Sequence, residues 1–310
     1  MLENKKTELL RAENLNKIFP GVHAVNDVSM TVYNNEVLGI CGENGAGKST
    51  LLKILGGIYK PESGRIFFRG EEVHFNSPQE SIRNGISIIH QELSYLNDLS
   101  IAENIYQGML PCKKNGTIDW NKMYADAEKA FAEFDIQVDV RQTMRSLPMA
   151  MKQFVEVVKA VSRNASLIIM DEPTSSLGPT DVPKLMKIIR QLITAGKSVI
   201  FISHRLEEIF EICDRLVVLC DGQLKAEFER GKFNKMDVIT QMVGRTFTQL
   251  YPKENVRLGD VRLKIENVST DRIKNITLQV RAGELVALYG MAGSGQDQIL
   301  ETIFGVGNLK

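Results

Sequence analysis

The chain lacks an excess of charge of either sign. Its 310 residues include 38 lysines and arginines and 38 aspartates and glutamates, so the formal net charge is zero. A protein that binds nucleic acid normally concentrates basic residues on one face of the domain. We therefore expect no nucleic-acid partner.

Cysteine is scarce, and apolar runs are short. The four cysteines show neither metal-ligand spacing nor a disulfide framework, which indicates free thiols and a reducing compartment. Residues 1–11 are charged and lack the apolar stretch of a signal peptide, and runs such as residues 216–220 are far below membrane-spanning length. We expect membrane association to occur only by docking to a separate integral partner.

Short runs of β-branched and aliphatic residues alternate with helical patterns along the chain. These runs are residues 37–41, 86–89, 167–170, 199–202 and 216–219. The alternation predicts an α/β fold with a mainly parallel sheet whose strands are buried on both faces. Apolar residues at helical spacing, such as Met123, Ala127 and Phe131, predict a helical insertion over about residues 93–163 and are interpreted as core packing.

An internal repeat divides the chain. Residues 26–57 reappear as residues 274–305, with Gly42 matching Gly290 and Gly47 matching Gly295. The repeat predicts a first domain over residues 1–250, a polar linker over 251–260, and the start of a second domain over 261–310 with a second strand-loop-helix unit. We therefore expect one complete domain and a second that is cut short.

A glycine-rich loop follows the first apolar run. The sequence from Gly42 to Ser49 fits the GxxxxGK[ST] pattern of a phosphate-binding loop between a strand and a helix. We expect backbone N–H groups to surround the phosphates, Lys48 to reach the β- and γ-phosphates, and Ser49 to bind Mg²⁺. The residues expected to contact the nucleotide in this loop are Gly42, Glu43, Asn44, Gly45, Ala46, Gly47, Lys48, Ser49 and Thr50.

Polar residues end three of the other strands. Asp171 and Glu172 follow an apolar run, an arrangement suited to a magnesium-orienting aspartate and an acidic residue that polarises water. Gln91 and His204 follow two further strands. Because the carboxyl ends of parallel strands meet at the ligand crevice, we expect both side chains to approach the γ-phosphate.

These segments resemble one family. GENGAGKST at 42–50, HQE at 90–92, MDEPTSSL at 170–177 and SHRLEEIF at 203–210 are similar to the Walker A, Q-loop, Walker B and switch-histidine segments of ATP-binding cassette proteins. With the duplication, the resemblance is greatest to the double-cassette ATPases of bacterial simple-sugar importers, especially the galactose and methyl-galactoside type, with ribose and xylose relatives next.

The resemblance implies a fold, a function and partners. The fold would be a P-loop NTPase cassette with a parallel core sheet, an antiparallel β subdomain and a helical subdomain. The function would be ATP hydrolysis with Mg²⁺, coupled to uptake of a simple sugar through a separate membrane permease. The implied partners are permease subunits, a sugar-binding protein and the second cassette of the same chain, and the implied location is the cytoplasmic side of the membrane, as a peripheral protein.

The resemblance also implies roles for single residues. Glu172, His204 and Lys48 would be catalytic, and Gln91 would sense the nucleotide. Ser49, Gln91 and Asp171 would hold the metal. Phe19 lies where many cassettes stack an aromatic ring on adenine, although a core aromatic is an equal alternative.

Two segments depart from the family pattern. The signature falls on residues 147–151, where Pro148 replaces the serine and Ala150 replaces a glycine. In the second loop, Gln296 replaces the lysine and Asp297 replaces the serine, which places negative charge beside any phosphate. If the cassettes pair head to tail, the two defects meet at one weakened site, and a competent signature for the first loop is expected beyond Lys310.

Three alternatives remain open. A small GTPase is suggested by the NKxD pattern at 234–237, but Asn234 is better interpreted as the cap of a helix. A soluble cassette protein without a transport role is the second alternative. The third is a fragment that binds ATP without turnover on its own.

Overall fold

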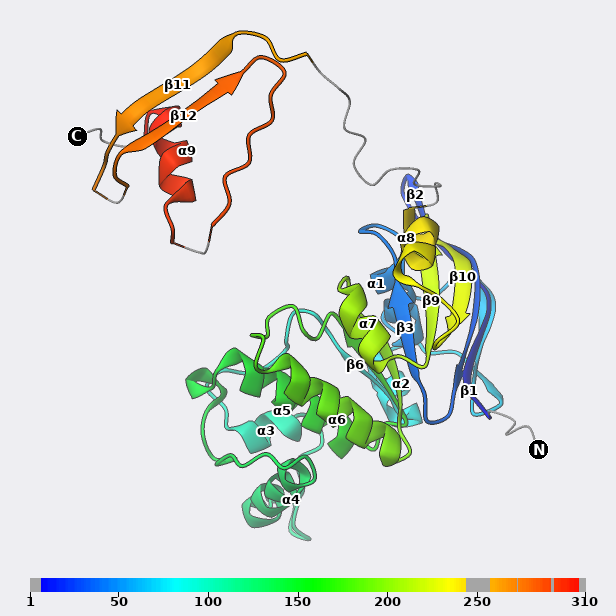
Figure 1. Cartoon of the computed structure of the whole chain (residues 1–310). Helices are drawn as coiled ribbons and strands as arrows, with labels where there is room; N and C mark the ends of the chain where they lie inside the picture. Colours follow the sequence, from blue (N-terminus) through cyan, green and yellow to red (C-terminus); the bar gives the residue numbers. More distant parts are fainter. Residues whose placement is uncertain (1–6, 244–256, 272, 291–292, 307–310) are drawn as a thin grey trace. The chain divides into compact units, whose positions relative to one another are not determined.

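The chain divides into two compact units, Met1–Thr246 and Phe247–Lys310, in the computed structural model (Figure 1). The structure describes residues 7–243, 257–271, 273–290 and 293–306. Residues 251–256 of the predicted linker lie outside the described residues, so the linker and the exact domain limits stay predictions.

A six-stranded sheet forms the centre of the first unit, in the order β10-β9-β3-β8-β7-β6. Its strands are β3 (Val37–Cys41), β6 (Ile86–Ile89), β7 (Leu167–Asp171), β8 (Ser198–Ile202), β9 (Arg215–Cys220) and β10 (Gln223–Glu229). The first five are parallel and coincide with the five apolar runs, which confirms the predicted parallel α/β sheet. Strand β10 pairs antiparallel with β9 at the sheet edge and has no fully buried residue.

The central strands are buried on both faces because alternate residues enter two different cores. On β3, Leu38 and Ile40 belong to one core, whereas Val37 and Cys41 belong to the other. Successive side chains of a strand point to opposite faces, so a strand covered on both sides is apolar throughout. This burial explains why these segments are continuous apolar runs in the sequence.

The first core lies between the central sheet and an antiparallel sheet with strand order β2-β1-β4-β5. Its strands are β1 (Glu8–Phe19), β2 (Val22–Tyr33), β4 (Ser63–Phe68) and β5 (Glu71–Val73). Helix α1 (Lys48–Leu55) contributes Leu51, Leu52, Ile54 and Leu55 to this core, and α2 (Pro78–Asn84) precedes β6. The core holds the start of α1 against β2.

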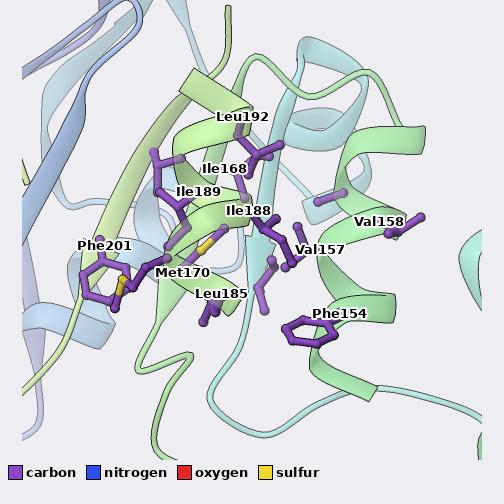
Figure 2. Close-up of a cluster of buried hydrophobic side chains, with 14 of the residues drawn as sticks. Phe154, Val157, Val158, Ile168, Met170, Leu185, Ile188, Ile189, Leu192 and Phe201 are labelled. Carbon is purple, nitrogen blue, oxygen red and sulfur yellow. The ribbon is translucent and has the colours of Figure 1, made fainter. Parts of the chain in front are cut away.

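Helices build the second core, on the other face of the central sheet. They are α3 (Ile101–Ile105), α4 (Trp120–Ala132), the 3₁₀ turn η1 (Met144–Ser146), α5 (Met149–Ser162), α6 (Val182–Thr194), α7 (Leu206–Ile212) and α8 (Lys235–Val243). Figure 2 shows Val157 of α5 beside Ile188 of α6, within a buried cluster that also contains Phe154 of α5 and residues of β7 and β8. Met123, Ala127 and Phe131 of α4 are buried in the same core, so their interpretation as core packing is confirmed.

The second unit contains β11 (Val261–Val268), β12 (Ile276–Arg281) and α9 (Gln296–Phe304), with β11 and β12 paired antiparallel. The repeat predicts a further strand just before the second loop, but residues 285–290 are not in a strand, so this part of the prediction is wrong. In the first unit, the equivalent strand β3 is held between β8 and β9, which come much later in the chain. The described residues of the second unit supply no such neighbours, and a strand without ladder partners does not form.

None of the helices within the described ranges combines the length and the hydropathy that crossing a membrane requires. The cysteines carry free thiols, with Cys41, Cys213 and Cys220 buried and Cys112 exposed.

Candidate functional site

A pocket of about 760 Å³ opens at the carboxyl ends of the central strands. Its walls come from β2, the loop after β3, the start of α1, and the residues that follow β6, β7 and β8. The lining residues are Val22, Ala24, Asn44, Gly45, Gly47, Lys48, Ser49, Thr50, Gln91, Glu172 and His204. The parallel sheet thus brings four separate sequence segments to one place, as predicted for this type of fold.

The loop from β3 to α1 has a backbone that requires glycine. Gly47 has a φ of 98°, in the left-handed region, and a Cβ atom there would lie 2.2 Å from the Ala24 carbonyl oxygen. Helix α1 begins at the next residue, and its first N–H groups have no partner within the helix. The loop therefore presents backbone donors and the positive end of a helix dipole to the pocket, which suits an anion.

Lys48 is buried at the base of this loop. Its Nζ atom donates to the carbonyl oxygens of Gly42 at 2.8 Å and Glu43 at 2.9 Å. Burial lowers the pKa of Lys48, while the carboxylates of Glu172 and Asp171 oppose this shift. The loop holds the ammonium group in the pocket wall, next to the backbone donors.

Asp171, the last residue of β7, is next to Ser49. Burial, followed by the charge of Glu172, raises the pKa of Asp171, whereas His90, a hydrogen bond with Ser49, and Lys48 lower it. Two adjacent carboxylates and a hydroxyl oxygen form the hard-oxygen environment that Mg²⁺ prefers. Within the ranges that the structure describes, no group of three or more His, Cys, Asp or Glu side chains could hold a metal by itself.

Glu172 has a backbone φ of 47°, which is rare for a residue with a side chain. Its Oε2 atom accepts a hydrogen bond from Gln91 Nε2 at 3.1 Å and lies 3.3 Å from His204 Nδ1. The three side chains predicted from different strand ends therefore meet at one carboxylate oxygen. A carboxylate oriented in this way can position a water molecule and accept its proton.

Some predicted residues lie outside the pocket wall, and some lining residues were not predicted. Phe19 is not among the described residues that line the pocket; its ring packs edge-on against Tyr59 with centroids 5.4 Å apart. Val22 and Ala24 line the pocket because β2 runs past the loop, and no sequence pattern marked them. His90 was also missed, although its place beside Gln91 at the end of β6 was a signal; it interacts electrostatically with Asp171, and burial lowers its pKa.

The two departures from the family pattern have structural counterparts. Pro148 is the N-cap of α5 and makes no side-chain capping hydrogen bond. In the second loop, the Ser294 hydroxyl donates to Gln296 Oε1 at 2.8 Å, while Met291 and Ala292 lie outside the described residues.

The NKxD pattern caps a helix. Asn234 Oδ1 accepts from the Asp237 backbone N–H at 3.0 Å, and Asp237 Oδ2 accepts from the Asn234 N–H at 2.9 Å. These reciprocal bonds at the start of α8 confirm the capping interpretation of Asn234.

Comparisons with known proteins agree with this geometry. The family model described as ABC transporter matches residues 25–175. The chain is 42% identical over 304 residues to a Rhizobium etli protein whose name describes ribose/galactose/methyl galactoside import, covering 96% of this chain and 58% of that protein. It is 40% identical to the galactose/methyl galactoside import ATP-binding protein MglA of Escherichia coli O157:H7, covering 96% and 59%. The chain thus spans less than two thirds of the length of these relatives.

Solved structures show the same fold. A nucleotide-free ATP-binding cassette from an ABC transporter is 25% identical, with a TM-score of 0.66 over 77% of this chain and 96% of that one. The MJ1267 cassette of an ABC transporter is 26% identical, with a TM-score of 0.69 over 77% and 98%. The first unit has the predicted P-loop NTPase cassette fold, and the chain belongs to the ATP-binding cassette family.

Proposed function

We propose that the pocket of the first unit binds ATP with Mg²⁺ and hydrolyses it. The observation that carries the proposal is the convergence of the loop, Lys48, Gln91, Glu172 and His204 on one pocket. The pocket combines a cation and backbone donors for phosphates with a carboxylate for water. The ABC transporter match and the names of the relatives support the same activity.

The residues divide the reaction between them. Loop N–H groups and Lys48 hold the β- and γ-phosphates, and Asp171 and Ser49 are the residues that would hold Mg²⁺, with Gln91 nearby. The metal would neutralise charge on the phosphate oxygens. Glu172 orients the attacking water and accepts its proton as the water oxygen bonds to the γ-phosphorus and the bond to the ADP oxygen breaks. His204 steadies Glu172 and the γ-phosphate. Phe19 packs against Tyr59 in the structure, so stacking on adenine would require its ring to move.

We further propose that hydrolysis drives uptake of a simple sugar, of the galactose, methyl-galactoside or ribose class, through separate permease subunits. The names of the relatives support this cargo, and their greater length supports a second cassette in the same polypeptide. A sugar-binding protein would deliver the cargo, and the chain would act as a peripheral protein at the cytoplasmic side of the membrane. The domain arrangement that we propose is residues 1–250, a linker at 251–260, and a second cassette from 261.

The two altered segments support an asymmetric motor. The α5 N-terminus at Pro148 offers no hydroxyl, and the loop at Gln296 and Asp297 offers no cation. If these face each other, only the site built on Lys48 hydrolyses ATP. We expect its partner to be a signature with serine and glycine in the second cassette that we propose.

The test is phosphate release by the complete gene product, with and without its permease in lipid vesicles. The wild-type protein should hydrolyse ATP, and Glu172→Gln should retain ATP binding but lose about 10³-fold in rate, since general base catalysis contributes about 10²–10⁴-fold. Glu211→Gln, at an exposed carboxylate paired with Arg190, is the matched control and should be fully active.

Two results would contradict the proposal. ATP binding without phosphate release, even with the permease present, would favour a nucleotide-binding role without turnover. Hydrolysis that no sugar or nucleoside stimulates in the reconstituted system would favour a cassette protein without a transport function.

A further inference from the structure

Glu208 is a buried carboxylate outside the pocket wall. It lies on α7 and is 7% exposed. Its Oε2 atom accepts hydrogen bonds from the hydroxyls of Thr174 and Ser203, each at 2.7 Å, and Arg205 NH1 donates to Oε1 at 3.3 Å. A buried carboxylate is costly unless it is hydrogen-bonded, so these donors make its position stable.

The two hydroxyls come from the two chain segments that carry proposed catalytic residues. Thr174 is two residues after Glu172, and Ser203 directly precedes His204. The parallel pairing of β7 with β8 ends at Asp171 and Ile202, with one more bond from the Glu172 N–H to the Ile202 oxygen at 3.0 Å. Beyond that point, the Glu208 carboxylate joins both segments through the hydroxyls of Thr174 and Ser203.

The strained backbone of Glu172 requires hydrogen bonds of this kind to hold it in place. A residue with a left-handed backbone persists only where its surroundings fix it from several sides. The bond to Ile202 fixes Glu172 on its N-terminal side, and the Thr174 hydroxyl, bound to Glu208, fixes the segment on its C-terminal side. Thr174 and Ser203 are each only 2% exposed, so water does not compete for these bonds.

We propose that Glu208 is a positioning residue that sets the geometry between Glu172 and His204. Its carboxylate holds Thr174 and Ser203 to one oxygen atom and thereby fixes the 3.3 Å approach of His204 Nδ1 to Glu172 Oε2. The role rests on the proposed hydrolysis at this pocket. Glu208 does not line the pocket, so we expect its loss to act on the rate of the chemical step and to leave nucleotide binding intact.

Thr174 provides the sharpest test, because its hydroxyl and its methyl group can be removed separately. Thr174→Val keeps the shape and removes the hydroxyl, whereas Thr174→Ser keeps the hydroxyl and removes a methyl group. In the complete gene product, Thr174→Val should lower kcat for ATP about tenfold with KM within twofold of wild type, since small misplacements of reacting groups cost up to about 100-fold. Thr174→Ser should keep kcat within about twofold.

A lower kcat for Thr174→Ser than for Thr174→Val would overturn the proposal. If Thr174→Ser loses more activity than Thr174→Val, packing of the methyl group matters and the hydroxyl does not. Equal kcat for wild type and Thr174→Val would also overturn it. Failure of the proposed function gives a different result, because the wild-type protein itself would then release no phosphate.

Substitutions at Glu208 and at the adjacent Glu207 provide a second test with a matched control. Glu208→Gln removes the charge and places an amide against Arg205, and it should lower kcat at least as much as Thr174→Val, again with KM unchanged. Glu207→Gln alters an exposed carboxylate that pairs with Lys235 at the surface and should leave kcat unchanged. A fall in ATP affinity for Glu208→Gln, measured by titration with a fluorescent ATP analogue, would show a general structural role and contradict positioning.

Discussion

The two glycine-rich loops have similar φ angles at two matching glycines but differ in their surroundings. Gly45 and Gly47 of the first loop have φ values of 87° and 98°, and Gly293 and Gly295 of the second loop have 83° and 105°. In both loops a helix begins directly after the last of these glycines. The local sequence is therefore sufficient to specify the turn and the start of the helix.

The surroundings distinguish a complete site from an incomplete one. Helix α1 buries four apolar residues, whereas no residue of α9 is buried. Lys48 crosses the first loop to two carbonyl oxygens, whereas among the described residues the Gln296 side chain accepts a hydrogen bond from the Ser294 hydroxyl of its own loop. The comparison teaches that a loop of this type becomes a functional site only when strands from elsewhere in the chain hold it and add catalytic side chains.

Replacing Lys48 of the first loop by glutamine, the residue at the equivalent position of the second loop, should have the largest effect. Lys48→Gln removes the buried cation and should weaken ATP binding about 100-fold, since hydrogen bonds to charged groups contribute about 1.5–3 kcal/mol each and 1.4 kcal/mol is tenfold in Kd. Isothermal titration with Mg²⁺-ATP measures the change. Lys53→Gln, on the same helix with Nζ 5.5 Å from the Tyr59 ring, is the control.

The reverse exchange sharpens the comparison. Gln296→Lys should not create ATP binding, because Asp297 remains beside the loop and the preceding residues form no strand. If Lys48→Gln binds ATP as tightly as wild type, the ammonium group does not contact the phosphates.

Glycine substitutions in the first loop should act on the stability of the fold. Gly47→Ala forces a Cβ atom to within 2.2 Å of the Ala24 oxygen and should lower the free energy of unfolding by about 3 kcal/mol or more. Gly45→Ala meets no atom within 4 Å and should cost only the left-handed backbone, about 1–2 kcal/mol. Urea unfolding measures both, and equal losses would show that contact with β2 does not constrain the loop.

The smallest expected effect concerns pH and Asp171. Because burial and Glu172 raise the pKa of Asp171 in the folded protein, its ionised form lowers stability at neutral pH, and this cost disappears as the pH falls through the raised pKa. Asp171→Asn should therefore raise Tm without nucleotide by on the order of 2 °C at pH 8, and by less at pH 5.

Its control is Asp98→Asn, at an exposed carboxylate paired with Arg145, which should show no such pH-dependent gain. Calorimetry at both pH values decides the matter. Mg²⁺-ATP should raise the Tm of the wild type and have little effect on Asp171→Asn. A lower Tm for Asp171→Asn at pH 8 would mean that the carboxylate stabilises the empty pocket.

Much of the first unit could be predicted from the sequence. The five apolar runs became the five parallel strands because burial on both faces leaves a continuous apolar signal, and β10 escaped notice because none of its residues is fully buried. The predicted carboxyl ends of the parallel strands indicated that Gln91, Glu172 and His204 would meet. Val22 and Ala24 carried no signal, since they line the pocket only through the path of β2 beside the loop.

The sequence by itself determined the five parallel strands of the central sheet, the glycine turns of both loops and the residue types that can bind phosphate. These features depend on side-chain periodicity, on the φ values open only to glycine and on charge, all of which are local properties. Only the tertiary structure decided that Glu172 would lie against both Gln91 and His204, that Glu208 would join the segments of Glu172 and His204, and that residues 285–290 would form no strand. Those outcomes depend on which distant segments are present to pair and pack, and no local pattern contains that information.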